Sequence, residues 1–295
     1  MITVLGATGH TGSVIAERLL ELEEFVRVVG RDEERLARFA EKGAELAVGD
    51  VSDTPFLTDA LRGADAAWLL IPPAYTEPDY LAYCDRIAAS IERAVRDSEI
   101  SHVAFLSSIG AEHATGTGPV AALHAMEERL RDVTAVNSLF LRAGYFYENH
   151  FDSLGLIAAQ GVNGGVFAPD APVTMVASRD VGEIAARALR SRDFGGVQVR
   201  GAVGPRDYTM GEVTRIIGEA IGRPDLPYVP FPREGFMQGM QQAGVSADAA
   251  RLFVEMSEAF NEGRMKAPDE RGDDNVGPTT FEEFAPALAA AYRGT

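Results

Sequence analysis

Three glycines within the first twelve residues constrain the fold of this chain more than any other feature. Gly6, Gly9 and Gly12 follow a short apolar run, Ile2–Leu5, and lead directly into an amphipathic stretch, Ser13–Leu22. Glycines at this spacing between a strand and a helix are typical of a turn that binds a dinucleotide. The first allows the tight turn, the second lets the backbone approach a pyrophosphate, and the third lets the helix pack close to the sheet. The sequence therefore predicts a strand, turn and helix that hold a phosphate at the helix N-terminus.

Short apolar runs alternate with helical patterns through the first half of the chain. We expect strands at Ile2–Leu5, Phe25–Val29, Glu45–Val48, Ala66–Ile71, His102–Leu106 and Ser138–Arg142. We expect helices between them at Ser13–Leu22, Glu33–Glu41, Pro55–Leu61, Asp79–Asp97 and Ala122–Arg131. Strands separated by such helices pair in parallel, and right-handed crossovers then produce a doubly wound sheet. The sequence predicts an α/β Rossmann domain over residues 1–150, with a turn that binds the cofactor through Gly6, Thr8, Gly9, His10, Thr11 and Gly12.

The pattern changes after residue 150. Glycines and prolines interrupt short apolar runs, and Lys266–Thr280 is charged and rich in glycine, which predicts a surface loop. Further elements are expected at Asp180–Arg190, Val197–Val203, Met210–Ile221, Arg233–Gln242 and Ala247–Asn261. We interpret residues 151–295 as a smaller α/β domain that binds substrate and acts as a lid. It is interleaved with the first domain, and some of its segments return to the Rossmann core.

The charge balance excludes several classes of partner. Against 44 Asp and Glu the chain has 27 Lys and Arg, a formal net charge of −17. Nucleic acids and anionic membranes are bound by basic surfaces, so we expect neither as a partner. No apolar run approaches the ~18–20 residues of a membrane span, and no charged leader precedes the glycines. We expect a cytoplasmic monomer or homodimer in which Cys84, the single cysteine, is a buried apolar residue.

The end of the second strand discriminates between the two nicotinamide cofactors. An acidic residue there binds the ribose 2′-hydroxyl of NAD, whereas a guanidinium binds the 2′-phosphate of NADP. Arg31 therefore favours NADPH over NAD, and Gly30 leaves room for the phosphate. Asp32 is the alternative, because it reaches a ribose hydroxyl if the loop turns differently.

Two other strand ends carry candidate cofactor contacts. Asp50 accepts a hydrogen bond from the adenine amine or caps the next turn, and the sequence leaves both options open. Ile71 and Pro72 end the fourth strand at the carboxyl edge of the sheet, where ligands bind in such folds. We expect these two residues to border the nicotinamide ribose.

With these motifs placed, the chain resembles the NmrA-like group of atypical short-chain dehydrogenase/reductases. The resemblance rests on Gly6–Gly12, Arg31, Gly49-Asp50, Leu106–Ser108, Leu141–Asn149, Val181–Leu189 and Thr279–Phe284. It implies a Rossmann fold, NADP(H) and a small substrate in a cleft. Members of the group reduce quinones, phenylpropanoids or aromatic polyketide ketones, or sense NADP and regulate a partner.

The usual proton relay of the wider superfamily is absent from this chain. Those enzymes use Tyr-x-x-x-Lys, in which the lysine lowers the pKa of the tyrosine. Here the only lysines, Lys42 and Lys266, lie outside the relevant segment. Ser107 and Ser108 stand where the family serine is, as donors to a carbonyl or as turn and capping residues. His124 lies near the family's lysine position, as a proton donor, a ribose contact or a helix-surface histidine.

Aromatic residues are the candidate substrate contacts. Tyr145 follows the sixth strand, as a catalytic hydroxyl or as a pocket wall. Tyr147, Asn149 and Phe231 are the other expected contacts. The stretch Phe231–Met240, together with Phe253, Met256 and Phe260, predicts an apolar lid or a plain core. A flat aromatic substrate suits such a wall.

These observations favour an NADPH-dependent reductase of a quinone or of an aromatic, polyketide-type ketone. Hydride transfer to such an electrophilic carbonyl proceeds largely by positioning, with the proton supplied by water or the substrate. The alternative is a regulatory protein that senses NADP(H) without turnover. We expect no metal site, because the spacing of His102, His113 and His124 does not resemble a zinc site.

Overall fold

A parallel sheet of seven strands forms the centre of the computed structural model, which describes residues 1–294. The strands are β1 (Ile2–Leu5), β2 (Val26–Gly30), β3 (Glu45–Val48), β4 (Ala66–Leu69), β5 (His102–Ser108), β6 (Asn137–Ala143) and β10 (Val197–Ala202). Their order in space is β10-β6-β5-β4-β1-β2-β3. The chain winds in one direction from β1 to β3 and in the other from β4 to β6. This switch between β1 and β4 confirms the predicted doubly wound fold, and in such folds ligands bind at the carboxyl edge beside the switch.

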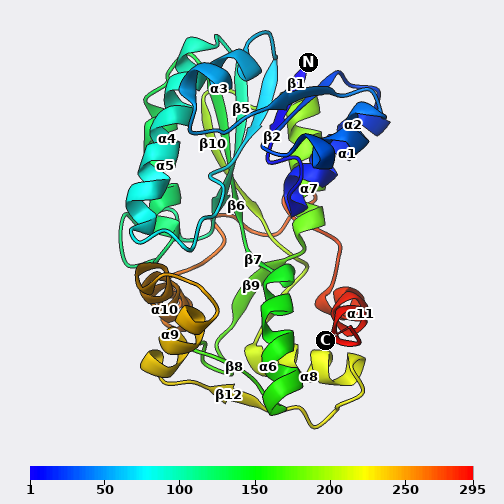
Figure 1. Ribbon diagram of the computed structural model, residues 1–295, viewed down its shortest axis with the longest axis vertical. Coiled ribbons are helices and arrows are strands. Elements are labelled where there is room, and N and C mark those ends of the chain that lie inside the picture. Colours follow the sequence, from blue (N-terminus) through cyan, green and yellow to red (C-terminus); the bar gives the residue numbers. More distant parts are fainter. Residues whose placement is uncertain (295) are drawn as a thin grey trace.

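Helices cover both faces of this sheet (Figure 1). On one face lie α1 (His10–Glu21), α2 (Glu33–Ala40) and α7 (Ser178–Ser191), and on the other lie α3 (Thr54–Leu61), α4 (Tyr80–Asp97) and α5 (Val120–Arg131). Because both faces are covered, the central strands are deeply buried, and every residue of β1 and of β4 is buried. Cys84 is buried inside α4, as predicted, and burial raises the pKa of its thiol to about 11.

A second layer of smaller elements lies beyond the carboxyl edge of the sheet (Figure 1). Its strands are β7 (Tyr145–Phe146), β8 (Asn163–Gly165), β9 (Val173–Val176), β11 (Asp207–Tyr208) and β12 (Tyr228–Pro230). Its helices are η1 (Tyr147–Ser153, 3₁₀), α6 (Leu154–Gln160), α8 (Met210–Ala220), α9 (Arg233–Gln242), α10 (Ala247–Asn261) and α11 (Phe281–Tyr292). The chain first passes from one layer to the other between β6, which ends at Ala143, and β7, which begins at Tyr145. Gly144 fits between them, since a β-carbon there would lie 2.8 Å from the Thr174 carbonyl oxygen.

The two layers are interleaved along the chain. Both α7 and β10 follow residue 150 and yet belong to the large sheet, and a bridge pairs Val203 with Val276 beyond β10. The division into domains near residue 150 stays a prediction. Among residues 1–294, no helix is both long enough and apolar enough to span a bilayer.

The structure departs from the sequence prediction at several short elements. Helix α1 begins at His10, three residues before the predicted start, because Gly9 is its N-cap. Strand β4 ends at Leu69, so the residues up to Pro73 form a loop. The predicted elements did not include α6, and for α11 only its start was expected, from the resemblance at Thr279–Phe284. Helix α11 begins with a capping box, in which the side chains of Thr280 and Glu283 each accept a hydrogen bond from the other residue's backbone amide.

Candidate functional site

The glycine turn is built to receive a ligand at the start of α1. Gly6 has a φ of +63°, and a β-carbon on Gly12 would lie 2.3 Å from the Gly6 carbonyl oxygen. Helix and turn can approach this closely only because Gly12 has no side chain. Gly9 caps α1 with no side-chain hydrogen bond, and the first turn carries no acidic residue. The amides at this end are therefore free for an anion, and the residues present fit a pyrophosphate.

Two arginines flank this turn at the end of β2. The side chain of Arg31 is 78% exposed, and its Nη1 lies 3.8 Å from Asp50 Oδ2. Arg35, which the sequence analysis did not single out, donates from Nη2 to the Thr8 carbonyl oxygen at 3.1 Å. It stands four residues after Arg31, on the first turn of α2, so the spacing in the sequence is the signal that would have found it.

The neighbouring carboxylates have structural partners. Asp32 is the N-cap of α2, and its side chain accepts a hydrogen bond from the Arg35 amide at 3.1 Å. Asp50 accepts one from the Ser52 amide at 2.8 Å. That bond, helped by Arg31, lowers the pKa of the Asp50 carboxyl. The second oxygen of Asp50 faces Arg31, so Asp50 both caps a turn and borders the exposed arginine.

The loop after β4 bridges the two layers. Ile71 and Pro72 lie here, and the Tyr83 hydroxyl donates to the Pro72 carbonyl oxygen at 3.0 Å. Farther along, the Tyr75 carbonyl oxygen accepts from the Ser246 amide at 2.8 Å, just before α10. These bonds place Ile71 and Pro72 at the junction of the large sheet with the second layer.

The two serines at the end of β5 have different surroundings. Ser107 is 2% exposed, and its hydroxyl donates to Glu127 Oε1 at 2.5 Å. Ser108 is partly exposed, and its hydroxyl donates to the carbonyl oxygens of Ile109 at 3.1 Å and Ala143 at 3.4 Å. Ser107 is therefore turned toward a buried carboxylate, and we retain only Ser108 as a candidate substrate contact.

His124 lies on α5 with one ring nitrogen engaged. Its Nδ1 stands 2.8 Å from the Ala111 carbonyl oxygen. Because a carbonyl oxygen only accepts, Nδ1 carries the hydrogen and Nε2 is the nitrogen left to exchange a proton or bond to a ligand. The side chain is partly exposed.

Aromatic side chains from both layers gather beyond these groups. We call Tyr75, Tyr145, Phe167, Phe253 and Phe260 the aromatic wall. The Tyr145 ring packs edge-on against Phe167 at 5.4 Å and Phe260 at 6.2 Å, and the Tyr75 ring lies 4.9 Å from Phe253. Burial raises the pKa of both tyrosines, and the carboxylate of Asp152 adds to each shift. The Asp152 residue is exposed, but protein atoms around its carboxyl partly remove it from water, and this desolvation raises its pKa.

The other expected substrate contacts lie in different places. Tyr147 is fully buried, and its hydroxyl donates to the Thr279 carbonyl oxygen at 3.2 Å, so a substrate contact does not fit it. The reason is local: β7 ends at Phe146 and a 3₁₀ helix begins at Tyr147, which turns this ring into the core. Asn149 is exposed on the same helix. Phe231 is half-buried against Gly164, at the small β8-β12 sheet.

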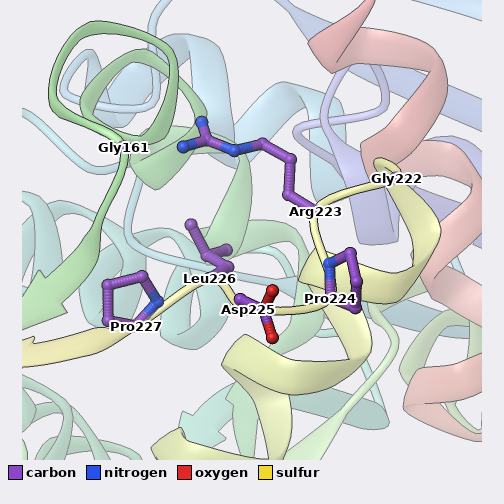
Figure 2. A pocket seen from close by; sticks show the side chains of 7 residues that line it. All are labelled: Gly161, Gly222, Arg223, Pro224, Asp225, Leu226 and Pro227. Atoms are coloured by element: carbon purple, nitrogen blue, oxygen red, sulfur yellow. The ribbon is translucent and has the colours of Figure 1, made fainter.

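A separate hollow lies far from the glycine turn. It lies between the end of α6 and the loop that follows α8 and has a volume of about 320 Å³. Figure 2 shows the residues that line it, with the Arg223 side chain extending toward α6. The Arg223 guanidinium donates to the Ile157 carbonyl oxygen at 3.1 Å. One nitrogen of the guanidinium is thus engaged by the backbone of α6. Within residues 1–294, no three His, Cys, Asp or Glu side chains are grouped to hold a metal ion.

The comparison with protein families agrees with this geometry. The model of the NmrA-like family matches residues 1–285. The chain belongs to the NmrA-like family. A Streptomyces griseus reductase of (4-alkanoyl-5-oxo-2,5-dihydrofuran-3-yl)methyl phosphate is 31% identical over 265 residues, 85% of this chain and 89% of that protein. The NAD(P)H azoreductase of Xenophilus azovorans is 26% identical over 307 residues, 99% of each chain.

Solved structures share the fold over the whole chain. An NADPH-dependent quinone oxidoreductase from Escherichia coli, complexed with NADPH, superposes with a TM-score of 0.83 at 19% identity, covering 98% of this chain and 99% of that one. A Citrobacter triphenylmethane reductase complexed with NADP(H) has a TM-score of 0.79 at 22% identity, covering 98% of this chain and 100% of that one. At these identities the likeness establishes the Rossmann fold.

Proposed function

We propose that this member of the NmrA-like family is an NADPH-dependent reductase of a quinone or of an aromatic, polyketide-type ketone. One observation carries the proposal: the open N-terminus of α1 and the second layer, which carries most of the aromatic wall, both lie at the carboxyl edge of one sheet, and we expect the ligand crevice between them. The names of the curated relatives, an NAD(P)H azoreductase and a phosphate-ester reductase, support the broader class of oxidoreductase.

Different residues around the crevice bind different parts of the cofactor. The turn from Gly6 to Gly12 holds the pyrophosphate through its amides, and Arg31 with Arg35 holds the 2′-phosphate. Asp50 borders the adenosine end, and Ile71 and Pro72 border the nicotinamide ribose. NADPH supplies a hydride when it is bound. This arrangement binds an anion despite the net charge of −17, because the local helix end and arginines provide the positive potential.

The substrate carbonyl is oriented by donors at the ends of β5 and β6. Reduction to a hydroxyl adds a hydride to carbon and a proton to oxygen. Ser108 leaves the Ile109 and Ala143 carbonyl oxygens and donates its hydroxyl hydrogen to that oxygen. His124 takes up a proton from water on Nε2, with Nδ1–H still bonded to Ala111, and passes it to the oxygen, or water delivers the proton directly. The raised pKa of Tyr145 keeps its phenol protonated, so it also serves as a hydrogen-bond donor.

The aromatic wall sets the substrate class. Flat rings stack against it in edge-to-face and offset contacts, while the Asp152 carboxylate disfavours an anionic substrate. We therefore expect neutral quinones and aryl ketones, bound by a monomer or homodimer. Phe231 and Asn149 remain proposed contacts at the margin of this surface.

A second function is favoured by one feature of the sequence. The chain has no Tyr-x-x-x-Lys, so binding of NADP(H) as a signal, without turnover, is the alternative. Oxidation of NADPH, followed by absorbance with a panel of quinones and aryl ketones, separates the two. Turnover with a neutral naphthoquinone and weaker turnover with its sulfonated form support the reductase. Tight NADPH binding with no oxidation across the panel supports the sensor.

A further inference from the structure

A buried ion pair lies directly behind the candidate site. Glu127 on α5 has 1% of its side chain exposed, and Arg142 on β6 has 9%. The Arg142 guanidinium donates a hydrogen bond to each carboxylate oxygen of Glu127, from Nε to Oε1 at 3.0 Å and from Nη2 to Oε2 at 2.7 Å. Ser107 donates to Oε1 of the same carboxylate. The pair therefore ties α5 to the ends of β5 and β6.

The third nitrogen of the same guanidinium reaches a different element. Arg142 Nη1 lies 2.9 Å from Glu112 Oε2, in the turn that follows β5. Glu112 is the residue after Ala111, whose carbonyl oxygen accepts the hydrogen of His124 Nδ1. One side chain thus holds both the helix that carries His124 and the turn that carries its acceptor.

A second guanidinium contacts the Glu127 carboxylate. Arg131 lies 3.4 Å from Glu127 and 3.0 Å from Glu128, so both guanidiniums share Glu127 and each also pairs with a second, exposed carboxylate. Burying such a pair contributes little net stability, because the cost of removing charges from water offsets their attraction. Directional bonds, in contrast, fix the relative placement of the elements that they join. His124 and Glu127 are three residues apart on α5, so fixing one orients the other.

We propose that Arg142, held between Glu127 and Glu112, is a positioning residue that keeps His124 in its Nδ1–H tautomer with Nε2 free at the crevice. The role rests on the proposed function, in which Nε2 meets the substrate or the cofactor. Arg142 itself touches neither. Its guanidinium acts through Glu112 and the Ala111 carbonyl.

Glu112→Gln tests this proposal without disrupting the core. Glu112 has 38% of its side chain exposed, and its loss leaves Arg142 paired with Glu127, so the variant is expected to fold. Glu128→Gln is the matched control, because Glu128 is 59% exposed on α5 and, within residues 1–294, its carboxylate pairs with Arg131 alone. Imidazole ¹⁵N NMR reports the tautomer, and a His124→Asn spectrum assigns the signal among the 5 histidines.

The wild-type protein and Glu128→Gln are expected to show His124 as the Nδ1–H tautomer, and Glu112→Gln a mixture of both. Turnover by Glu112→Gln should fall about tenfold with unchanged NADPH affinity, a part of the 10²–10⁴ that a positioned acid contributes. An unchanged His124 tautomer in Glu112→Gln would overturn the proposal. The spectrum tests the role of Arg142 even if no substrate is turned over. Absence of turnover would count against the proposed reductase activity and not against the positioning role.

Discussion

The α-carbon of Gly12 packs against the Gly6 carbonyl group, where a β-carbon would lie 2.3 Å from the oxygen. This contact joins α1 to the glycine turn, so both the fold and the phosphate site depend on it. Gly12→Ala is expected to destabilise the protein by about 1–3 kcal/mol, because the helix must shift away from the turn. NADPH affinity should fall at least tenfold. Urea unfolding and fluorescence titration with NADPH measure the two effects.

Gly155 provides the control for this substitution. It lies in α6, and a β-carbon there meets no atom within 4 Å. Gly155→Ala should leave NADPH affinity unchanged and raise stability by up to about 1 kcal/mol, since alanine favours a helix. If Gly12→Ala bound NADPH as tightly as Gly155→Ala, the glycine turn would not be the phosphate site.

Arg31 is expected to distinguish NADPH from NADH. A hydrogen bond to a charged group contributes about 2 kcal/mol, so Arg31→Ala should weaken NADPH binding about thirtyfold and NADH binding little. Arg35→Ala should act in the same direction. Arg38→Ala, one turn farther along α2 and paired with Glu17, is the control. Isothermal titration with both nucleotides tests this, and an equal loss for NADPH and NADH in Arg31→Ala would refute the assignment.

The two serines of β5 should separate stability from activity. Ser107→Ala removes a donor from the buried Glu127 carboxylate, so the free energy of unfolding should fall by about 1–3 kcal/mol. Ser108→Ala is expected to leave stability unchanged within about 0.5 kcal/mol and to lower kcat. Chemical unfolding and steady-state kinetics of the pair give the comparison. A kcat of Ser108→Ala equal to that of the wild type would remove Ser108 from the mechanism.

Much of the large sheet could be predicted because its signals are local. Apolar runs separated by amphipathic helices specify β1 to β6 and their parallel pairing. Which of two neighbouring residues at the end of a strand is buried could not be predicted in the same way. Which of Ser107 and Ser108 is buried depends on Glu127, twenty residues later on another element. That pairing leaves no trace in a local pattern.

The second layer was harder to predict for a related reason. Its strands have two to four residues, too few to show an alternating pattern of apolar and polar residues. The direction of its aromatic side chains also changes where a strand gives way to a helix. Tyr145 and Tyr147 would share a face if the strand continued, but the 3₁₀ helix turns Tyr147 into the core. Arg142 and Glu112 illustrate the same limit, since charged residues are normally assigned to the surface.

His150 predicts a loss of stability in mild acid. It is 5% exposed beside Tyr145 and Phe281, and its Nε2 has no hydrogen-bond partner among residues 1–294. Burial lowers the pKa of its imidazole from 6.5 to about 4. Between these values the unfolded chain binds the proton and the folded protein does not. The stability is therefore fully present above pH 6.5 and falls as the pH drops toward 4.

The size of this effect is about 3 kcal/mol, from the pKa difference of His150. His150→Phe keeps a ring among the aromatic neighbours and removes the titration. Urea unfolding at several pH values between 7 and 4.5 is expected to show a shallower decline for His150→Phe than for the wild type. Parallel declines would mean that His150 is not the group responsible.

The central claim is that hydride passes from NADPH to a carbonyl held against the aromatic wall. Stopped-flow mixing of the NADPH-saturated protein with excess neutral naphthoquinone, followed at about 340 nm, tests it in a single turnover. We predict a first-order loss of the NADPH absorbance that is slowed in Ser108→Ala. An NADPH absorbance that stays constant while the nucleotide remains bound would contradict the claim.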